Sequence, residues 1–70
     1  MKTEVFALKV RFAMRINESY LTEKEKEVVS KYYGLNDDVR HNLEELASIY
    51  GVTRERIRQI KVVALNKLGL

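Results

Sequence analysis

The sequence contains no cysteine and no proline, and only three glycines among its 70 residues. Without cysteine, neither disulfides nor thiolate metal sites can stabilise the fold, and a chain this short has a core only marginally sufficient for one domain. No apolar run reaches the roughly 18 residues that a membrane span needs, and the first residues do not resemble a signal peptide. We therefore expect a soluble, unprocessed cytoplasmic protein with no membrane contact, held together by packed helices.

The sequence also lacks the side chains that most catalytic and metal sites need. His41 is the only histidine, and no second ligand or nucleophile accompanies it, so we interpret it as a loop residue. Glu23, Glu25 and Glu27 cluster at an expected helix start, where carboxylates favour the helix dipole, and no pocket is indicated that would raise the pKa of one of them. We therefore predict no enzyme, no cofactor and no metal site.

Positive charge is concentrated at the two ends of the chain. Residues 1–16 carry four bases and one acid, residues 17–52 carry four bases and eight acids, and residues 53–70 carry five bases and one acid. A basic terminal segment behind an acidic middle is typical of a module that touches a polyanion with one edge. Taken alone, such a run is more often a solvated helix face, so charge by itself does not establish nucleic-acid binding.

A first helix is predicted at about residues 23–33. Thr22 is followed three residues later by Glu25, which is the pattern of a capping box, with Leu21 placed to pack against the helix entry. Gly34 ends the helix, because glycine adopts the left-handed conformation of many helix ends. The inner side should carry Val28, Val29 and Tyr32. Tyr32 and Tyr33 are expected in the core and at its rim rather than stacked on bases.

A loop and a second, short helix follow. Residues 35–41 read as a loop, with a turn at Asn36-Asp37-Asp38. Asn42 can accept from the amides of the next helix, assisted by Glu45, and Gly51 ends that helix. Its buried face should consist of the residues spaced i, i+3, i+4 and i+7, which are Leu43, Leu46, Ala47 and Tyr50.

A third helix should begin after Thr53 and run to about Leu68. Val52 is expected to turn inward, and the apolar side of the helix should carry Ile57, Ile60, Ala64 and Leu68. A helix of about eight residues, a tight turn at Gly51 and a second helix two residues later form a helix-turn-helix. Ala47 is small where the two helices would cross. A helical hairpin without any DNA role would use the same features.

Residues 4–16 are compatible with two structures. Six apolar residues alternate with basic ones and alanines, as in a half-buried strand: Phe6, Leu8, Val10, Phe12, Met14 and Ile16. A lone strand would need a second copy or another protein to pair with, whereas a helix could pack within the monomer. We favour the helix and keep the strand, with a homodimer through residues 4–16, as the alternative. The fold class is therefore all-α, a small helical bundle with a C-terminal helix-turn-helix.

The exposed side of the third helix carries the residue types that read bases. On a helical projection, four side chains of its first two turns share an arc of about 140° opposite the apolar side: Arg54, Glu55, Arg58 and Gln59. Arginine can donate twice to guanine, glutamine pairs with adenine, and glutamate accepts from the cytosine amino group. Glu55 could instead pair with Arg58 or Gln59 and orient them.

Three strings of the sequence resemble a known family: VTRERIRQI at residues 52–60, NLEELASIYG before it, and LTEKEKEVVSKYYGL nearer the N-terminus. They are similar to the fourth conserved region of housekeeping-type bacterial sigma factors, over about residues 20–68. The resemblance implies binding to the upstream promoter element and docking on the flap of the RNA polymerase beta subunit. It implies base contacts by Arg54, Glu55, Arg58 and Gln59. It also implies backbone contacts around Lys24, Leu43, Glu44 and Thr53, where amides at helix starts can face phosphates, to which we add the bases Arg56 and Lys61.

The chain departs from the family pattern after Ile60, where Val63 and Asn66 replace two bases. In the family these positions contact DNA or neighbouring activators, so phosphate affinity and activator response are not carried over. Nothing in the chain resembles the sigma regions that bind the polymerase clamp and melt DNA. We therefore expect an excised domain or a stand-alone relative, encoded by a bacterium or a phage.

These observations predict sequence-specific binding to promoter DNA in transcription initiation by a domain at residues 20–70, preceded by an N-terminal amphipathic segment at residues 1–19. The alternative is a sigma-like adapter that binds RNA polymerase or a sigma-binding protein with weak or no DNA binding. Val62, Val63 and the N-terminal apolar stretch favour the adapter. The base-reading side chains of the third helix oppose it.

Overall fold

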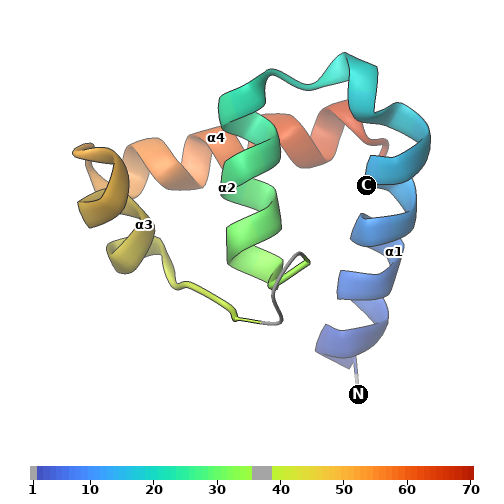
Figure 1. Cartoon of the computed structure of the whole chain (residues 1–70), viewed down its shortest axis with the longest axis horizontal. Coiled ribbons are helices and arrows are strands. Elements are labelled where there is room, and N and C mark those ends of the chain that lie inside the picture. The colour runs from blue at the N-terminus through green and yellow to red at the C-terminus, as the bar shows by residue number, and fades with distance from the viewer. Residues whose placement is uncertain (1, 36–38) are drawn as a thin grey trace.

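A computed structural model, shown in Figure 1, describes residues 2–35 and 39–70 of the chain. The described residues form only helices and the segments that connect them, which confirms the all-α prediction. The elements are α1 (Lys2–Asn17), the short 3-10 helix η1 (Glu18–Tyr20), α2 (Glu23–Tyr33), α3 (Leu43–Tyr50) and α4 (Arg54–Lys67). The predicted turn at Asn36-Asp37-Asp38 lies outside the described residues. None of the described helices has both the length and the apolar character that crossing a membrane requires.

Capping boxes begin α2 and α3, as the sequence predicts. The Thr22 hydroxyl accepts from the Glu25 amide at 3.2 Å, and the Thr22 amide donates to the Glu25 carboxylate at 2.8 Å. Asn42 and Glu45 make the same reciprocal pair at 2.8 and 2.9 Å. Each box satisfies two backbone amides that a helix start would otherwise leave to water. Local sequence therefore determines where both helices begin.

The turn between α3 and α4 depends on Gly51. This residue has φ 66° and ψ 35°, in the left-handed region, and the Val52 amide donates across it to the Ala47 carbonyl at 3.0 Å. Such a bond over a left-handed residue is a common helix ending. Thr53 then begins α4 by accepting from the amide three residues later at 3.1 Å. Gly34 ends α2 with the same φ of 66°.

The inward orientation predicted for Val52 is wrong. Val52 is 37% exposed and does not belong to the residues packed against the core. Its position explains this, because it lies between the left-handed Gly51 and the extended cap residue Thr53, at the outer corner of the turn. Ile57 and Ile60 fill the space between the helices instead.

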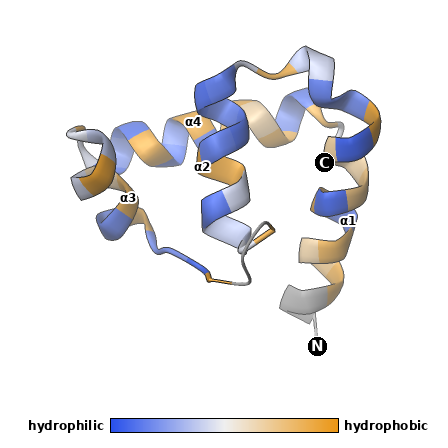
Figure 2. Cartoon of the chain, viewed as in Figure 1, coloured by the Kyte–Doolittle hydropathy of each residue, from blue (hydrophilic) through white to orange (hydrophobic). Residues whose placement is uncertain are grey.

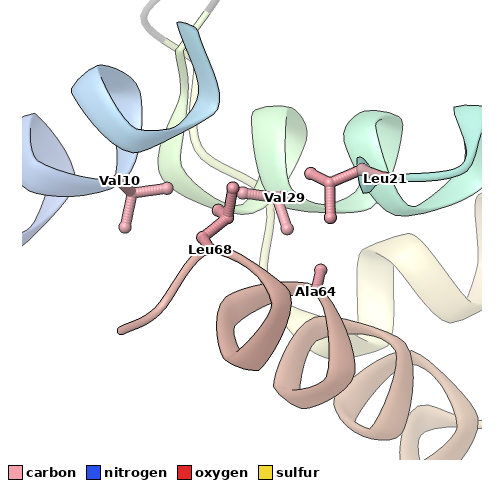
Figure 3. Packing of buried hydrophobic residues seen from close by; sticks show 5 residues of the cluster. All are labelled: Val10, Leu21, Val29, Ala64 and Leu68. Carbon is pink, nitrogen blue, oxygen red and sulfur yellow. The ribbon is translucent and has the colours of Figure 1, made fainter. Parts of the chain in front are cut away.

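Two apolar clusters make up the core, and α4 contributes to both. The first joins α1, α2 and the end of α4 and contains Val10, Leu21, Val29, Ala64 and Leu68 (Figure 3). The second joins α2, α3 and the first half of α4 and contains Val28, Leu46, Ile57 and Ile60. In Figure 1, α4 accordingly runs across α2, with α3 near one end and α1 near the other. The predicted apolar side of α4 is confirmed, and the predicted face of α3 packs on the second cluster, although only Leu46 in it is fully buried.

The N-terminal segment is a helix, so the strand alternative is wrong. Val10 is completely buried in the first cluster, and the Phe6 ring lies 5.8 Å from the Tyr33 ring. Apolar residues occur along the coloured part of α1 in Figure 2, and most of them are not covered. The large apolar residues of α1 that remain more than half exposed are Val5, Leu8, Phe12 and Ile16. The helix therefore packs through a narrow strip and leaves an apolar surface open.

An ion pair connects the start of α2 to the end of α4. The Lys67 ammonium donates to the Glu25 carboxylate at 2.9 Å, and Glu25 is only 8% exposed. Burial disfavours the charged carboxylate, but hydrogen bonds from Lys67 and from the Thr22 amide outweigh it and hold the pKa of Glu25 below its ordinary value. Lys67 therefore stabilises the fold rather than adding to the exposed positive charge of α4.

This pair predicts a pH-dependent contribution to stability. Because the folded-state pKa of Glu25 is lowered, the contribution is present above the ordinary carboxylate pKa of about 4.3 and is lost as the pH falls through the folded-state value. Glu25→Gln keeps the capping pattern, and Lys67→Met keeps the aliphatic length. In urea denaturation at pH 7, the double-mutant cycle should give a coupling of about 0.5–1 kcal/mol that is absent at pH 2.5. If the two substitutions had additive effects on the free energy of unfolding at pH 7, the ion pair would make no contribution to stability and the prediction would be wrong.

Gly51 should be intolerant of side chains for a backbone reason alone. A Cβ built at this position meets no atom within 4 Å, so the cost of Gly51→Ala is that of holding a non-glycine residue at φ +66°, about 1 kcal/mol. Gly51→Val should cost more, because β-branched residues fit this conformation worst. Urea denaturation would measure both, with Ser48→Ala on the exposed side of α3 as the control. A Gly51→Val chain as stable as the wild type would show that the turn is not as described.

Candidate nucleic-acid interface

The first two turns of α4 bring the four predicted base-contact residues to one exposed face. Their side chains are all exposed, whereas Ile57 and Ile60 on the opposite side are buried. The four residues are Arg54, Glu55, Arg58 and Gln59. Burial of the isoleucines thus determines which side of the helix faces outward. A helix presented in this way can enter a major groove with its N-terminal turns foremost.

Glu55 and Arg58 form a salt bridge on this face. Arg58 Nε donates to both carboxylate oxygens of Glu55, at 2.9 and 3.0 Å, and one terminal nitrogen of the guanidinium also donates to Glu55. The hydrogen bond lowers the pKa of Glu55 and raises that of Arg58. Of the alternatives for Glu55, pairing with Arg58 is therefore the one observed in the free chain. Both side chains are exposed, so exchange of this pair for contacts to bases costs little.

Arg54 lies beside the start of α3. It borders a groove whose other walls include Arg40, His41, Asn42 and Leu43, from the loop and the first turn of α3. The fold therefore places Arg54, a predicted base-contact residue of α4, next to the helix start for which phosphate contacts are predicted. Arg54 and the first residues of α3 are separated in sequence by the rest of α3, and the helix-turn-helix brings them together in space.

The helix starts offer backbone donors. In the first turn of α3 the Glu45 amide is taken by Asn42, which leaves the amides of Leu43 and Glu44 as donors without an intrahelical partner. Thr53 caps α4 in the same manner and is exposed. Amides in this position carry the positive end of the helix dipole and favour anions.

Two of the predicted phosphate contacts lie over tyrosine rings. The Lys24 ammonium is 5.1 Å from the centre of the Tyr50 ring, and the Lys61 ammonium is 4.4 Å from that of Tyr32. Each contact joins different helices and restricts where the ammonium lies, at a gain of about 0.5–1 kcal/mol. Neither contact was predicted from the sequence, because the partners are far apart in the chain and no local spacing indicates them.

The remaining predicted residues have simpler surroundings. Arg56 is exposed in the first turn of α4. It lies on the flank between the buried side and the face that carries Arg54, Glu55, Arg58 and Gln59, which we call the reading face. His41 holds the loop to the end of α2, because its amide donates to the Lys31 carbonyl at 2.9 Å and its Nδ1 lies 3.4 Å from the same oxygen. Tyr32 and Tyr33 are half-buried and pack edge to face at 4.9 Å, as expected for the core rim.

Metal-binding geometry is not found in the described part of the chain, where no three histidine or carboxylate side chains gather closely enough to hold an ion. The electrostatic character of the site comes from α4 itself. Two of its five bases pair with carboxylates, Arg58 with Glu55 and Lys67 with Glu25. Among the described residues, the bases of α4 that form no salt bridge with a carboxylate are therefore Arg54, Arg56 and Lys61, all of them before the last turn of the helix.

Comparisons with known proteins agree with this arrangement. Residues 19–69 match the family described as sigma-70, region 4. Over 48 residues the chain is 52% identical to the RNA polymerase sigma factor SigA of a Bacillus species and 50% identical to SigA of Listeria monocytogenes serovar 1/2a (strain ATCC BAA-679 / EGD-e). Each match covers 69% of this chain and 13% of the relative, so the chain corresponds to a small part of those proteins. No solved structure matches the chain significantly. Since the family match spans most of the sequence and includes all of α2, α3 and α4, the chain belongs to the sigma-70 region 4 family.

Proposed function

We propose that the chain recognises promoter DNA in transcription initiation, with α4 in the major groove. The observation that carries this proposal is the shared exposed face of Arg54, Glu55, Arg58 and Gln59 at the start of α4. Arg54 and Arg58 are suited to guanine, Gln59 to adenine and Glu55 to cytosine. On binding, the Glu55–Arg58 salt bridge either opens or stays closed and directs the guanidinium toward a base.

Phosphate contacts would orient the helix in the groove. We assign them to the amides of Leu43 and Glu44, to the capped start at Thr53, and to the side chains of Lys24, Arg56 and Lys61. The amides lie at helix starts, and the two lysines are held over tyrosine rings rather than extended freely into solvent. Such contacts fix register on the duplex and contribute affinity that falls with salt concentration.

RNA polymerase is the protein partner that we propose, with the flap of its beta subunit as the docking element implied by the family. The exposed apolar side of α1 supports a protein contact in this part of the chain, since Leu8 and Phe12 are about two-thirds exposed. We accordingly assign DNA binding, and the flap docking implied by the family, to residues 20–70, and we propose a further protein contact through residues 1–19. The cytoplasm of a bacterium, or of a phage-infected host, is the compartment where both partners occur.

The adapter without DNA binding is the second candidate. Its support is the exposed apolar surface of α1, together with Val62 at 38% and Val63 at 46% exposed. The base-reading set on α4 opposes it, because an adapter has no need for arginine and glutamine at those positions. Titration of the chain with promoter-like and scrambled duplexes at two salt concentrations separates the two candidates, since only a reading helix discriminates between the duplexes.

Arg58→Ala should weaken binding selectively. On the preferred duplex the loss should be about 1–3 kcal/mol, with relaxed discrimination at one base pair, because arginine makes two bonds to guanine that alanine cannot make. Arg11→Ala removes the same charge from α1, outside the helix-turn-helix, and is the matched control, for which discrimination should not change. Fluorescence titration against duplexes with single base-pair changes provides the measurement. An equal loss on every duplex would show that Arg58 contacts phosphate only.

Residues 1–16 should stabilise a monomer. Deleting them removes Val10 from the first cluster, a loss of about 2 kcal/mol, which corresponds to a Tm lower by roughly 10 °C for a chain of this size. Thermal unfolding and sedimentation of the full and truncated chains would test this. A homodimer through residues 4–16 remains the competing proposal for the open face of α1. It would appear as a full-length dimer that truncation converts into a monomer, with the helix-turn-helix still folded.

A further inference from the structure

The reading face of α4 continues beyond the predicted base-contact residues. Val62 follows Glu55, Arg58 and Gln59 at the spacing i, i+3, i+4 and i+7, so all four lie along one side of the helix. In homeodomains, side chains at this same spacing on one helix reach base edges in the major groove. Val62 is 38% exposed, so its side chain is accessible on that side.

Valine at this position restricts what can be read. Its side chain has no hydrogen-bonding atom, so it cannot recognise the donors and acceptors of a base edge. The major groove presents one exposed apolar group, the C5-methyl of thymine, which aliphatic side chains contact. The chemistry of Val62 therefore matches a thymine and no other base.

The surroundings of Val62 argue against a protein-docking role. Along the exposed side it is bordered by polar residues, with Arg58 and Gln59 one turn before it and Asn66 one turn after it. The adjacent Val63 is also exposed, but it lies about 100° farther round the helix, on the flank of α4. Leu65 packs against the first core cluster. On the face shared with Arg58 and Gln59, the open apolar surface at Val62 is thus one side chain wide, which suits a methyl group and is far smaller than a protein interface.

We propose that Val62 is a fifth base-reading residue and contacts the methyl group of a thymine. This inference rests on the proposed function, because it requires α4 in the major groove. Val62 lies four residues after Arg58, which is about 6 Å farther along the helix axis. The thymine is therefore next to the base pairs read by Arg58 and Gln59, at the edge of the recognised site.

Replacement of thymine by uracil tests the proposal, because uracil pairs like thymine but lacks the methyl group. Each thymine of the preferred duplex is replaced in turn, and binding of the full 70-residue chain is measured by fluorescence titration. At one position the wild type should lose about three- to five-fold in affinity, the size expected for one buried methyl group. Val62→Ala should lose a similar factor on the thymine duplex and show no further loss with uracil.

Val63→Ala is the matched control, since it removes the same atoms from the neighbouring exposed valine, on the flank of α4. It should retain the uracil effect in full, and unchanged melting curves for both variants would show that the fold is intact. Discrimination between duplexes with no Val62-dependent uracil effect would overturn this inference and leave the proposed function standing. Equal binding to preferred and scrambled duplexes would reject both.

Discussion

The packing of Ile57 against Leu46 and Val28 determines how α4 is presented. These side chains are completely buried where α2, α3 and α4 meet, and they hold one side of α4 against the other two helices. The opposite side must then face outward, and it carries the arginines and the glutamine. Gly51 contributes to the same result, because its left-handed conformation allows α4 to start at the angle that the cluster requires. One side of α4 thus packs in the core and the other carries the proposed base contacts, so mutations in the cluster should weaken the proposed DNA binding without altering any residue of that face.

The bases of α4 are not equivalent, although they look alike in the sequence. Lys67 is bound to Glu25 and supports the fold, Arg58 is held by Glu55 on the reading face, and Lys61 lies over the Tyr32 ring. Each arrangement restricts a flexible side chain before any ligand arrives, which lowers the ordering cost of binding.

Much of this structure could be predicted from local sequence. Capping boxes at Thr22 and Asn42, helix ends at two glycines and the apolar spacing of α4 are encoded within a few neighbouring residues, and all were confirmed. The exposed face of α4 followed from the same periodicity. The inward orientation predicted for Val52 was wrong, because hydrophobic periodicity does not describe the corner of a turn. There the backbone conformation determines which way the side chain points.

Other features depend on contacts that no local pattern contains. The Glu25–Lys67 bridge and the lysine–tyrosine contacts join residues far apart in the chain. The N-terminal segment was ambiguous because its apolar residues fit both the period of a strand and that of a helix. The helix it forms buries only a narrow strip, which includes Val10.

We propose that α4 reads bases while the starts of α3 and α4 contact phosphates. Nuclear magnetic resonance of the isotope-labelled chain, titrated with a promoter-like and a scrambled duplex, is the decisive test. We expect the promoter-like duplex to shift the amides of residues 43–44 and 53–62, together with the side-chain signals of Arg58 and Gln59. The scrambled duplex should shift the helix-start amides and leave those two side chains nearly unchanged. Shifts confined to α1, or side-chain shifts identical for both duplexes, would contradict it.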